Sequence, residues 1–188
     1  MLHVVHQGVA PYAIASLVTH HFMNAIGGIT LGELDRQLKT EAWQHYKNWC
    51  RTRKSVVCPT SSMFSSQRFG RDSWQTYPEL ASCYKGAMVK YLIFWTDMFL
   101  QEKVAQNDTE QNRLRAHCAY SLAQFQFLQE VSGPWLTEPV AKEMHDMGRT
   151  FLLFYQKLAV KTKGEFPEKK CIRWCQSSIV FCTCASLW

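Results

Sequence analysis

Apolar residues recur at spacings of three and four along most of the chain between about Pro11 and Gly164, which is the period of one helical face. Five segments have this pattern, and no segment alternates apolar and polar residues as a strand would. We therefore expect helices over residues 11–26, 30–53, 78–106, 109–131 and 137–164, and an all-α fold.

Capping patterns predict where several of these helices begin. Thr30 with Glu33, and Asp108 with Gln111, each have the spacing of a capping box, in which a side chain accepts from the third amide of the helix. Thr137 precedes the last helix and is followed by a proline in the first turn. The short connections favour antiparallel neighbours, so the sequence predicts one up-down bundle of about five helices.

The third segment is expected to be the central helix. Its main apolar line includes Tyr84, Trp95 and Phe99, but Leu92 and Phe94 lie off that line. A helix that is apolar on more than one side is buried on more than one side. We expect it to begin at Pro78.

A stretch without acidic residues carries the whole formal net charge of +6. It runs from residue 47 to residue 71 and includes a serine-rich connector with one short helix expected to end near Phe69. Cations with neighbouring aromatics such as Trp49 and Trp74 can bind nucleic-acid backbone and bases. The alternative is a solvated face, with Trp49 in the core of its helix. The candidate nucleic-acid-binding residues are Lys47, Arg51, Arg53, Lys54, Arg68 and Arg71.

Residues 165–188 are expected to lie outside the helical domain, which spans residues 1–164. The last eighteen residues hold four of the eight cysteines and no acid. Their cysteines are separated by three, six and one residues, which differs from the paired CxxC spacing of zinc sites. We interpret them as ordinary thiols, and the tail as a hypothetical out-of-frame or intron-derived extension.

The chain lacks the usual catalytic motifs. It has no GxSxG, HExxH or glycine-rich phosphate loop. His45, His117 and His145 each stand alone on a predicted helix, and His20 and His21 are adjacent, so they point about 100° apart. We therefore expect no enzyme activity, no catalytic or metal-binding residue and no cofactor.

Neither a signal peptide nor a membrane span is predicted. The most apolar window, residues 81–100, carries Lys85, Lys90 and Asp97, and ionisable groups are costly at bilayer depth. We expect an intracellular protein, nuclear or cytoplasmic, with reduced cysteines and no membrane partner.

Leu2 to Val9 resembles a segment of the transposases of CACTA-type cut-and-paste elements, with His3, Gly8 and Val9 as the matching residues. In that pattern a catalytic aspartate precedes the histidine, and here it would fall at or before Met1. The body, above all residues 153–159, is similar to an uncharacterised family abundant in dinoflagellate genomes. The resemblance implies a helical remnant of a polynucleotidyl transferase, and neither metal-binding carboxylate can be placed.

Two main functions remain open at this point. The first is a catalytically incomplete, transposon-derived helical fragment with weak nucleic-acid binding. The second is a helical protein-interaction module, which predicts an exposed apolar patch. The sequence does not predict an oligomeric state.

Overall fold

The computed structural model describes residues 8–25, 29–53, 58–133 and 135–172. These residues form an all-α bundle without strands, which confirms the expected fold class. The helices are α2 (Ala10–Ala25), α3 (Leu31–Gln37), α4 (Trp43–Arg51), α5 (Gly86–Gln106), α6 (Glu110–Val131) and α7 (Glu138–Glu165). A π-helical turn, Leu38–Ala42, joins α3 and α4 into one continuous helix, so the body has five helical rods as predicted.

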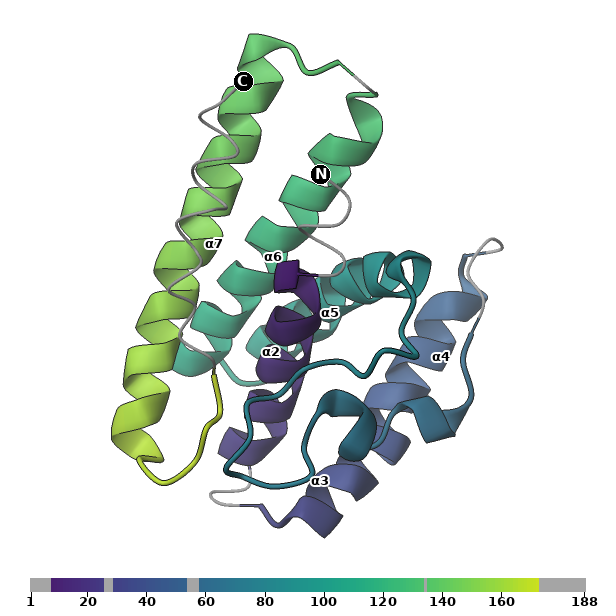
Figure 1. Cartoon of the computed structure of the whole chain (residues 1–188), viewed down its shortest axis with the longest axis vertical. Coiled ribbons are helices and arrows are strands. Elements are labelled where there is room, and N and C mark those ends of the chain that lie inside the picture. Colours follow the sequence, from purple (N-terminus) through teal and green to yellow (C-terminus); the bar gives the residue numbers. More distant parts are fainter. Residues whose placement is uncertain (1–7, 26–28, 54–57, 134, 173–188) are drawn as a thin grey trace.

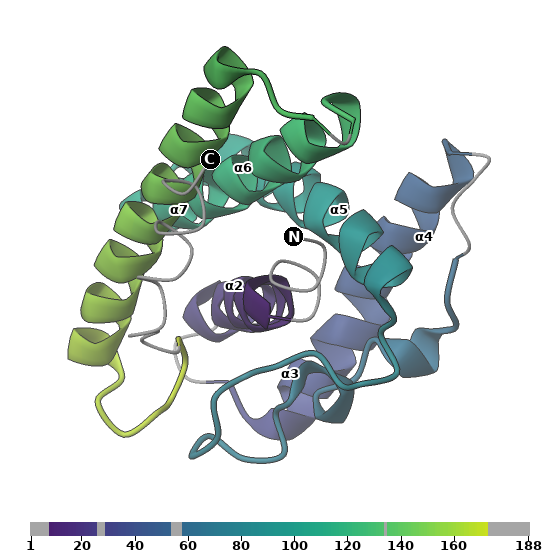
Figure 2. The same cartoon turned by 45° about the horizontal axis from the view of Figure 1, so that its top comes forward.

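The most enclosed helix is α2, not the third predicted helix. Every residue of α2 from Ala13 to Met23 is buried. Figure 2 shows α2 in the middle, with α5, α6, α7 and the α3–α4 rod around it. Buried Thr19 and Ser16 are tolerated there because they are hydrogen-bonded: Thr19 donates to the Ala15 carbonyl of its own helix at 2.7 Å, and Ser16 accepts from the Tyr155 hydroxyl of α7 at 3.2 Å.

The two longest helices, α6 and α7, lie side by side as an antiparallel hairpin (Figure 1). The residues at spacings of three and four along α6 are all buried: Leu114, Cys118, Leu122, Phe125 and Leu128. On the apolar line of α7, Met144, Phe151, Tyr155 and Leu158 are buried, whereas Val140 and Met147 are half-buried. The helical period was therefore a sound guide to the buried faces of this hairpin.

The Thr30 capping box is present as predicted. The Thr30 side chain accepts from the Glu33 amide at 3.2 Å, and Glu33 accepts from the Thr30 amide at 3.0 Å. The cap of α6 differs from its prediction by one residue. Thr109, rather than Asp108, accepts from the Asn112 amide, while Asp108 pairs with Arg113.

The third helix begins at Gly86, eight residues after the predicted Pro78. The backbone amides of Leu80 and Ala81 donate instead to the carbonyls of Pro11 and Arg68. These long-range bonds remove the segment from any helix, and Leu80 and Tyr84 are still buried. The expected single short helix near Phe69 is two 3₁₀ turns, Ser61–Met63 and Gln67–Phe69.

An aromatic cluster joins α4, the connector and α5. Trp95 stacks on Phe99 with ring centroids 5.2 Å apart and meets Tyr46 and Phe64 edge to face at 5.5 and 5.6 Å. Offset and edge-to-face arrangements are the favourable ones for aromatic rings. The cluster fixes α4 against α5. It therefore positions the end of α4, where candidate nucleic-acid-binding residues lie.

The described part of the predicted tail contacts the bundle. The Lys170 amide donates to the Trp74 carbonyl at 2.9 Å, and Gln75 donates to the Glu168 carbonyl at 3.1 Å. Cys171 is buried, with its sulfur 3.2 Å from that of Met23. We call residues 166–172 the C-terminal strap. The strap therefore packs against the connector and α2, and residues 173–188 of the predicted tail lie outside the described residues.

A substitution at Gly70 tests whether the close approach of the Glu79 backbone stabilises the connector. The φ of Gly70 is +67°, and a Cβ there would lie 2.5 Å from both the amide nitrogen and the carbonyl oxygen of Glu79. We expect Gly70→Ala to lower the free energy of unfolding by about 2–3 kcal/mol, from left-handed strain plus overpacking. Urea titration measures this loss.

Gly133 is the matched control, because its φ is +66° but a Cβ would meet nothing within 4 Å. We expect Gly133→Ala to cost only about 1 kcal/mol, the conformational part alone. Equal losses for the two variants would show that the close approach of Glu79 to Gly70 does not matter.

Candidate functional site

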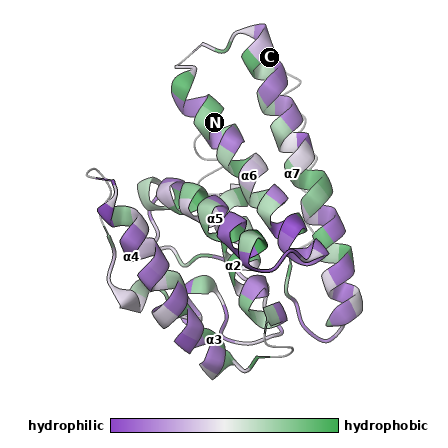
Figure 3. Cartoon of the chain, turned by 180° about the vertical axis from the view of Figure 1, so that it is seen from behind, coloured by the Kyte–Doolittle hydropathy of each residue, from purple (hydrophilic) through white to green (hydrophobic). Residues whose placement is uncertain are grey.

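Three of the six candidate nucleic-acid-binding residues lie together in the second half of α4 or just after it. Lys47 and Arg51 are four residues apart and share a helical face, and Arg53 follows the last turn. Cations are favoured at that end because the helix dipole is negative there. The outward side of α3 and α4 is largely hydrophilic (Figure 3).

These three side chains contact only neutral groups among the described residues. Lys47 lies over the Trp43 ring at 4.8 Å, and Arg53 lies over the Trp49 ring at 4.2 Å. Arg51 donates to the Asn48 side chain at 3.3 Å. No carboxylate pairs with any of the three within the part of the chain that the structure describes.

Arg68 is also exposed, and Lys54 lies outside the described residues. Arg68 belongs to the second 3₁₀ turn, and its guanidinium is 3.5 Å from the sulfur of Cys83. We use the name basic edge for Lys47, Arg51, Arg53 and Arg68. Arg51, Arg53 and Arg68 are exposed and Lys47 is half-buried. Arg68 lies closer to α3 than the other three do, since the nearby Ser66 amide donates to Asp35 at 3.0 Å.

Arg71 corrects the prediction, because its side chain is only 1% exposed. Its guanidinium donates to the carbonyls of Thr76 at 2.8 Å, Lys170 at 2.7 Å and Cys171 at 3.0 Å. Burial lowers the pKa of Arg71 to about 10, so it stays charged at neutral pH. A buried cation that joins the connector to the C-terminal strap is a structural group and is unavailable to a polyanion.

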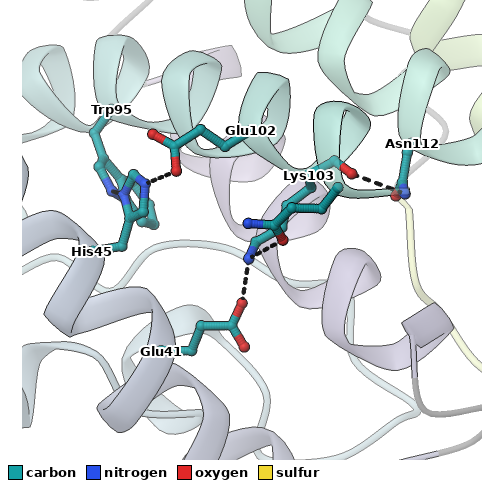
Figure 4. Close-up of polar contacts among 7 residues, drawn as sticks. Glu41, His45, Trp95, Glu102, Lys103 and Asn112 are labelled. Atoms are coloured by element: carbon teal, nitrogen blue, oxygen red, sulfur yellow. Dashed lines mark hydrogen bonds and ion pairs between the residues drawn. The ribbon is translucent and has the colours of Figure 1, made fainter. Parts of the chain in front are cut away.

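The histidines expected to stand alone each have a neighbour in the structure. The Trp95 indole donates to Nδ1 of His45 at 2.9 Å, which leaves the proton of neutral His45 on Nε2, 2.9 Å from Glu102 (Figure 4). His117 stacks on Phe154 at 4.7 Å. No nucleophile is hydrogen-bonded to either ring among the described residues.

His20 and His21 are buried inside α2, and burial is the main cause of the lowered pKa of both imidazoles. The Arg115 guanidinium, which can only donate, lies 2.8 Å from Nδ1 of His20. His20 therefore carries its proton on Nε2, which lies 3.0 Å from the Thr162 hydroxyl. His20 is a neutral bridge between α6 and α7.

No group of three or more histidine, cysteine, aspartate or glutamate side chains is arranged to hold a metal ion within the described ranges. Cys171 is the one tail cysteine among them, and its buried thiol has a raised pKa. Cys175, Cys182 and Cys184 lie outside, so the interpretation of the tail cysteines as ordinary thiols stays a prediction.

A pocket of about 390 Å³ lies where four helical segments meet, and sequence reasoning missed it. Its wall comes from the end of α2, the α3–α4 rod, the end of α5 and the start of α6. The lining residues span 94 positions, from His21 to Arg115, so no local motif could indicate the pocket. Its lining residues are His21, Phe22, Asn24, Ala25, Gln37, Glu41, Lys103, Gln106, Asn107, Thr109, Asn112 and Arg115.

Lys103 holds the polar side of this pocket together. Figure 4 shows Glu41 and Lys103 pointing toward each other, with Lys103 Nζ 2.7 Å from the Glu41 carboxylate. The same ammonium donates to Gln106 at 3.1 Å and lies 5.2 Å from the centre of the Phe99 ring. Asn112 donates to the Asn107 carbonyl at 2.6 Å, which fixes the start of α6 against the end of α5.

No described helix of the chain is long and apolar enough to cross a bilayer. Comparisons of the chain with protein-family models, with curated proteins and with solved structures returned no match.

Proposed function

We propose that the chain is a non-catalytic helical module that binds the phosphate backbone of nucleic acid weakly through the basic edge. The observation that supports this most is the set of surface cations at the end of α4 without a carboxylate partner among the described residues. Lys39, Lys90 and Lys161 are each paired with an acid, whereas the exposed Lys142, Arg149 and Lys163 on α7, like the basic edge, have no ion pair among the described residues. Unpaired cations are the ones that can release counterions from a polyanion.

The proposed binding is to backbone rather than to bases. Trp49 is 3% exposed and is covered by Arg53, so its ring is unavailable for stacking on a base. Phe64 and Phe69 are fully buried in the aromatic cluster. Trp74 is half-buried, and the Arg71 and Lys169 cations lie 5.1 and 4.6 Å from its ring centre. Without base stacking we expect little preference for single strands over duplex, and little dependence on sequence.

The proposed origin is a transposon-derived fragment, from the resemblance of residues 2–9 and of residues 153–159 to the families named above. Nuclear or cytoplasmic location belongs to the same proposal. Genomic context tests the origin: an upstream frame carrying the expected aspartate would support it, and unrelated flanking sequence would contradict it.

The binding proposal predicts a strong dependence on salt. With four phosphate contacts, we expect affinity for a duplex or single-stranded oligonucleotide to fall roughly 50- to 150-fold between 50 and 200 mM salt. Replacing Lys47, Arg51 and Arg53 together by glutamine should leave a fall of only about fourfold. Filter binding at several salt concentrations measures both slopes.

The control is Arg113→Gln, because this exposed arginine is paired with Asp108 and lies outside the basic edge. It should keep the wild-type salt dependence. Binding that is absent, or equal in the triple variant and wild type, would refute the proposal.

A second candidate is a protein-interaction module, favoured by exposed apolar side chains at the turn between α6 and α7. Val131 and Trp135 are 61% and 83% exposed, and Trp135 is the most exposed of the large apolar side chains described. An exposed tryptophan is a common anchor at protein interfaces. A partner recovered by wild type and lost with Trp135→Ser would support this candidate, and equal recovery would count against it.

A further inference from the structure

Two cysteine thiols lie together where the connector follows the end of α4. Cys50 is buried in the last turn of α4, with 6% of its surface exposed, and Cys58 is exposed where the described part of the connector begins. Both are free thiols, and their side chains form a hydrogen bond with each other. Two thiols in hydrogen-bond contact are close enough for one sulfur to attack the other once either is oxidised.

The Pro59 carbonyl holds Cys58 against α4. This oxygen accepts from the Trp43 indole at 3.2 Å and from the Cys58 thiol at 3.5 Å. Trp43 precedes Cys50 by seven residues, which is about two helical turns, so the two side chains share one face of the helix. Two contacts that do not involve Cys50 itself therefore keep Cys58 on the face of α4 that carries Cys50.

The surroundings of the two sulfurs give them different roles. Burial raises the pKa of Cys50 to about 11, and the neighbouring Cys58 acts in the same direction. The Tyr46 hydroxyl and the Arg53 cation oppose this shift in pKa but do not cancel it. Cys50 is therefore almost entirely protonated at neutral pH and is hidden from solvent, so an oxidant in solution meets the exposed Cys58 first.

The other described cysteines have different neighbours. Cys83 lies 3.5 Å from the guanidinium of Arg68, and the buried Cys171 lies beside the sulfur of Met23. Cys118 is buried on α6. None of these contacts is with a second thiol, so Cys50 and Cys58 are the pair that the fold brings together among the described cysteines.

We propose that Cys50 and Cys58 are a peroxide-sensitive pair, which closes to a disulfide between the end of α4 and the connector. The Cys58 sulfur attacks one oxygen of hydrogen peroxide, and the displaced hydroxide leaves with the thiol proton as water, so that Cys58 becomes a sulfenic acid. The Cys50 sulfur then attacks the Cys58 sulfur, and the sulfenic hydroxyl leaves with the Cys50 proton as a second water. The two sulfurs lose two electrons, which reduce the peroxide to two waters.

The disulfide closes a loop of the chain that contains Arg51 and Arg53 of the basic edge. Oxidation therefore acts beside the surface proposed above to bind nucleic acid. The pair itself does not depend on that binding, because its own contacts define it and its test contains no nucleic acid.

The test is mass spectrometry of the full, reduced chain after a small molar excess of hydrogen peroxide at neutral pH, followed by alkylation of free thiols and digestion with trypsin. Trypsin cuts after each lysine and arginine between the two cysteines, so Cys50 and Cys58 are recovered in separate peptides, residues 48–51 and 55–68, unless a disulfide joins them. We expect the joined peptides, lighter than their sum by two hydrogens, as the main oxidised product, and dithiothreitol should separate them.

The same treatment in urea separates the effect of the fold from that of nearness in sequence. Unfolding should cost the selectivity, so that Cys58 is distributed over several partners. Selectivity in urea equal to that of the native chain would overturn the proposal. A native chain in which Cys58 joins mainly another cysteine, such as Cys83 or Cys182, or in which peroxide leaves Cys50 and Cys58 alkylated, would also overturn it.

Single variants assign the two roles. In Cys50→Ser the reaction should stop at the sulfenic acid, so that dimedone labels Cys58 and the joined peptide is lost. Cys58→Ser, at an exposed position, should leave the buried Cys50 reduced and unlabelled by dimedone. Cys83→Ser is the matched control and should keep the wild-type amount of joined peptide. A joined peptide lost in Cys83→Ser, or Cys50 labelled in Cys58→Ser as fully as Cys58 is in Cys50→Ser, would contradict the assignment.

Discussion

Arg71→Met is expected to lower the free energy of unfolding by about 3–5 kcal/mol. Three backbone carbonyls, those of Thr76, Lys170 and Cys171, accept from this one guanidinium. Hydrogen bonds to charged groups contribute about 1.5–3 kcal/mol each, and buried carbonyls left without a donor are costly. Methionine keeps much of the aliphatic volume and the packing on Trp74, so the loss reports mainly the missing donors.

Urea unfolding gives the global loss, and hydrogen exchange gives its location. The Lys170 amide donates to the Trp74 carbonyl. The Arg71→Met substitution should increase its exchange rate, relative to wild type, more than it increases the exchange rates of the α6 amides. Arg68→Met is the matched control, because Arg68 is exposed three residues earlier, and surface changes usually cost under about 0.5 kcal/mol. A cost no greater than that of Arg68→Met would show that the strap does not depend on Arg71.

Acidification below pH 6.5 is expected to destabilise the fold through the histidines of α2. The ordinary histidine pKa of 6.5 applies to the unfolded chain, whereas burial lowers the folded pKa of His21 to about 3. Between these values the unfolded chain binds a proton that the folded protein does not, so stability falls as the pH falls. By pH 5, His21 alone accounts for about 2 kcal/mol, and His20 acts in the same direction.

The carboxylates change the free energy of unfolding in a different pH range from the histidines. The lowered pKa values of Asp35, Glu33 and Glu110 cause losses only as the pH falls through the range of ordinary carboxylates, below about 4.5. Burial raises the pKa of Asp97, which favours the folded state in acid and partly offsets the histidines. Comparing wild type with a variant that lacks the imidazole therefore isolates the contribution of His21 to the pH dependence of the free energy of unfolding.

The measurement is urea unfolding at several pH values from 7 to 5 for wild type and His21→Leu. The variant should lose about 2 kcal/mol less over this range than the wild type does. His117→Gln is the control, because His117 is exposed on α6, and it should keep the wild-type slope. Equal slopes for wild type and His21→Leu would refute the assignment of His21 as a buried neutral group.

The sequence predicted the elements governed by local rules. The Thr30 capping box and the inner face of α6 depend on residues three or four apart, and both are present in the structure. Pro78 satisfied the local rule for a helix start, but Leu80 bonds to the distant carbonyl of Pro11, and the helix begins later. Tertiary hydrogen bonds overrode a weak local preference.

The candidate site was harder to predict for the same reason. Arg71 and Arg68 are both cations in an acid-free stretch, and nothing in the local sequence separates them. Arg71 becomes buried because carbonyls about a hundred residues later, in the C-terminal strap, receive its hydrogen bonds. Arg115 on α6 gave no signal at all, since its partner His20 lies in the first helix.

We propose that the acid-free stretch supplies two kinds of cation: surface groups that bind polyanions, and the buried Arg71, which holds the C-terminal strap. Phenylglyoxal modification of each arginine in the native chain, followed by mass spectrometry with and without a duplex oligonucleotide, tests it most directly. We predict that Arg51, Arg53 and Arg68 react rapidly and are protected by DNA, while Arg71 stays unreactive in both samples. Rapid modification of Arg71 together with its protection by DNA would show that Arg71 is a surface cation that binds DNA and not a buried structural group.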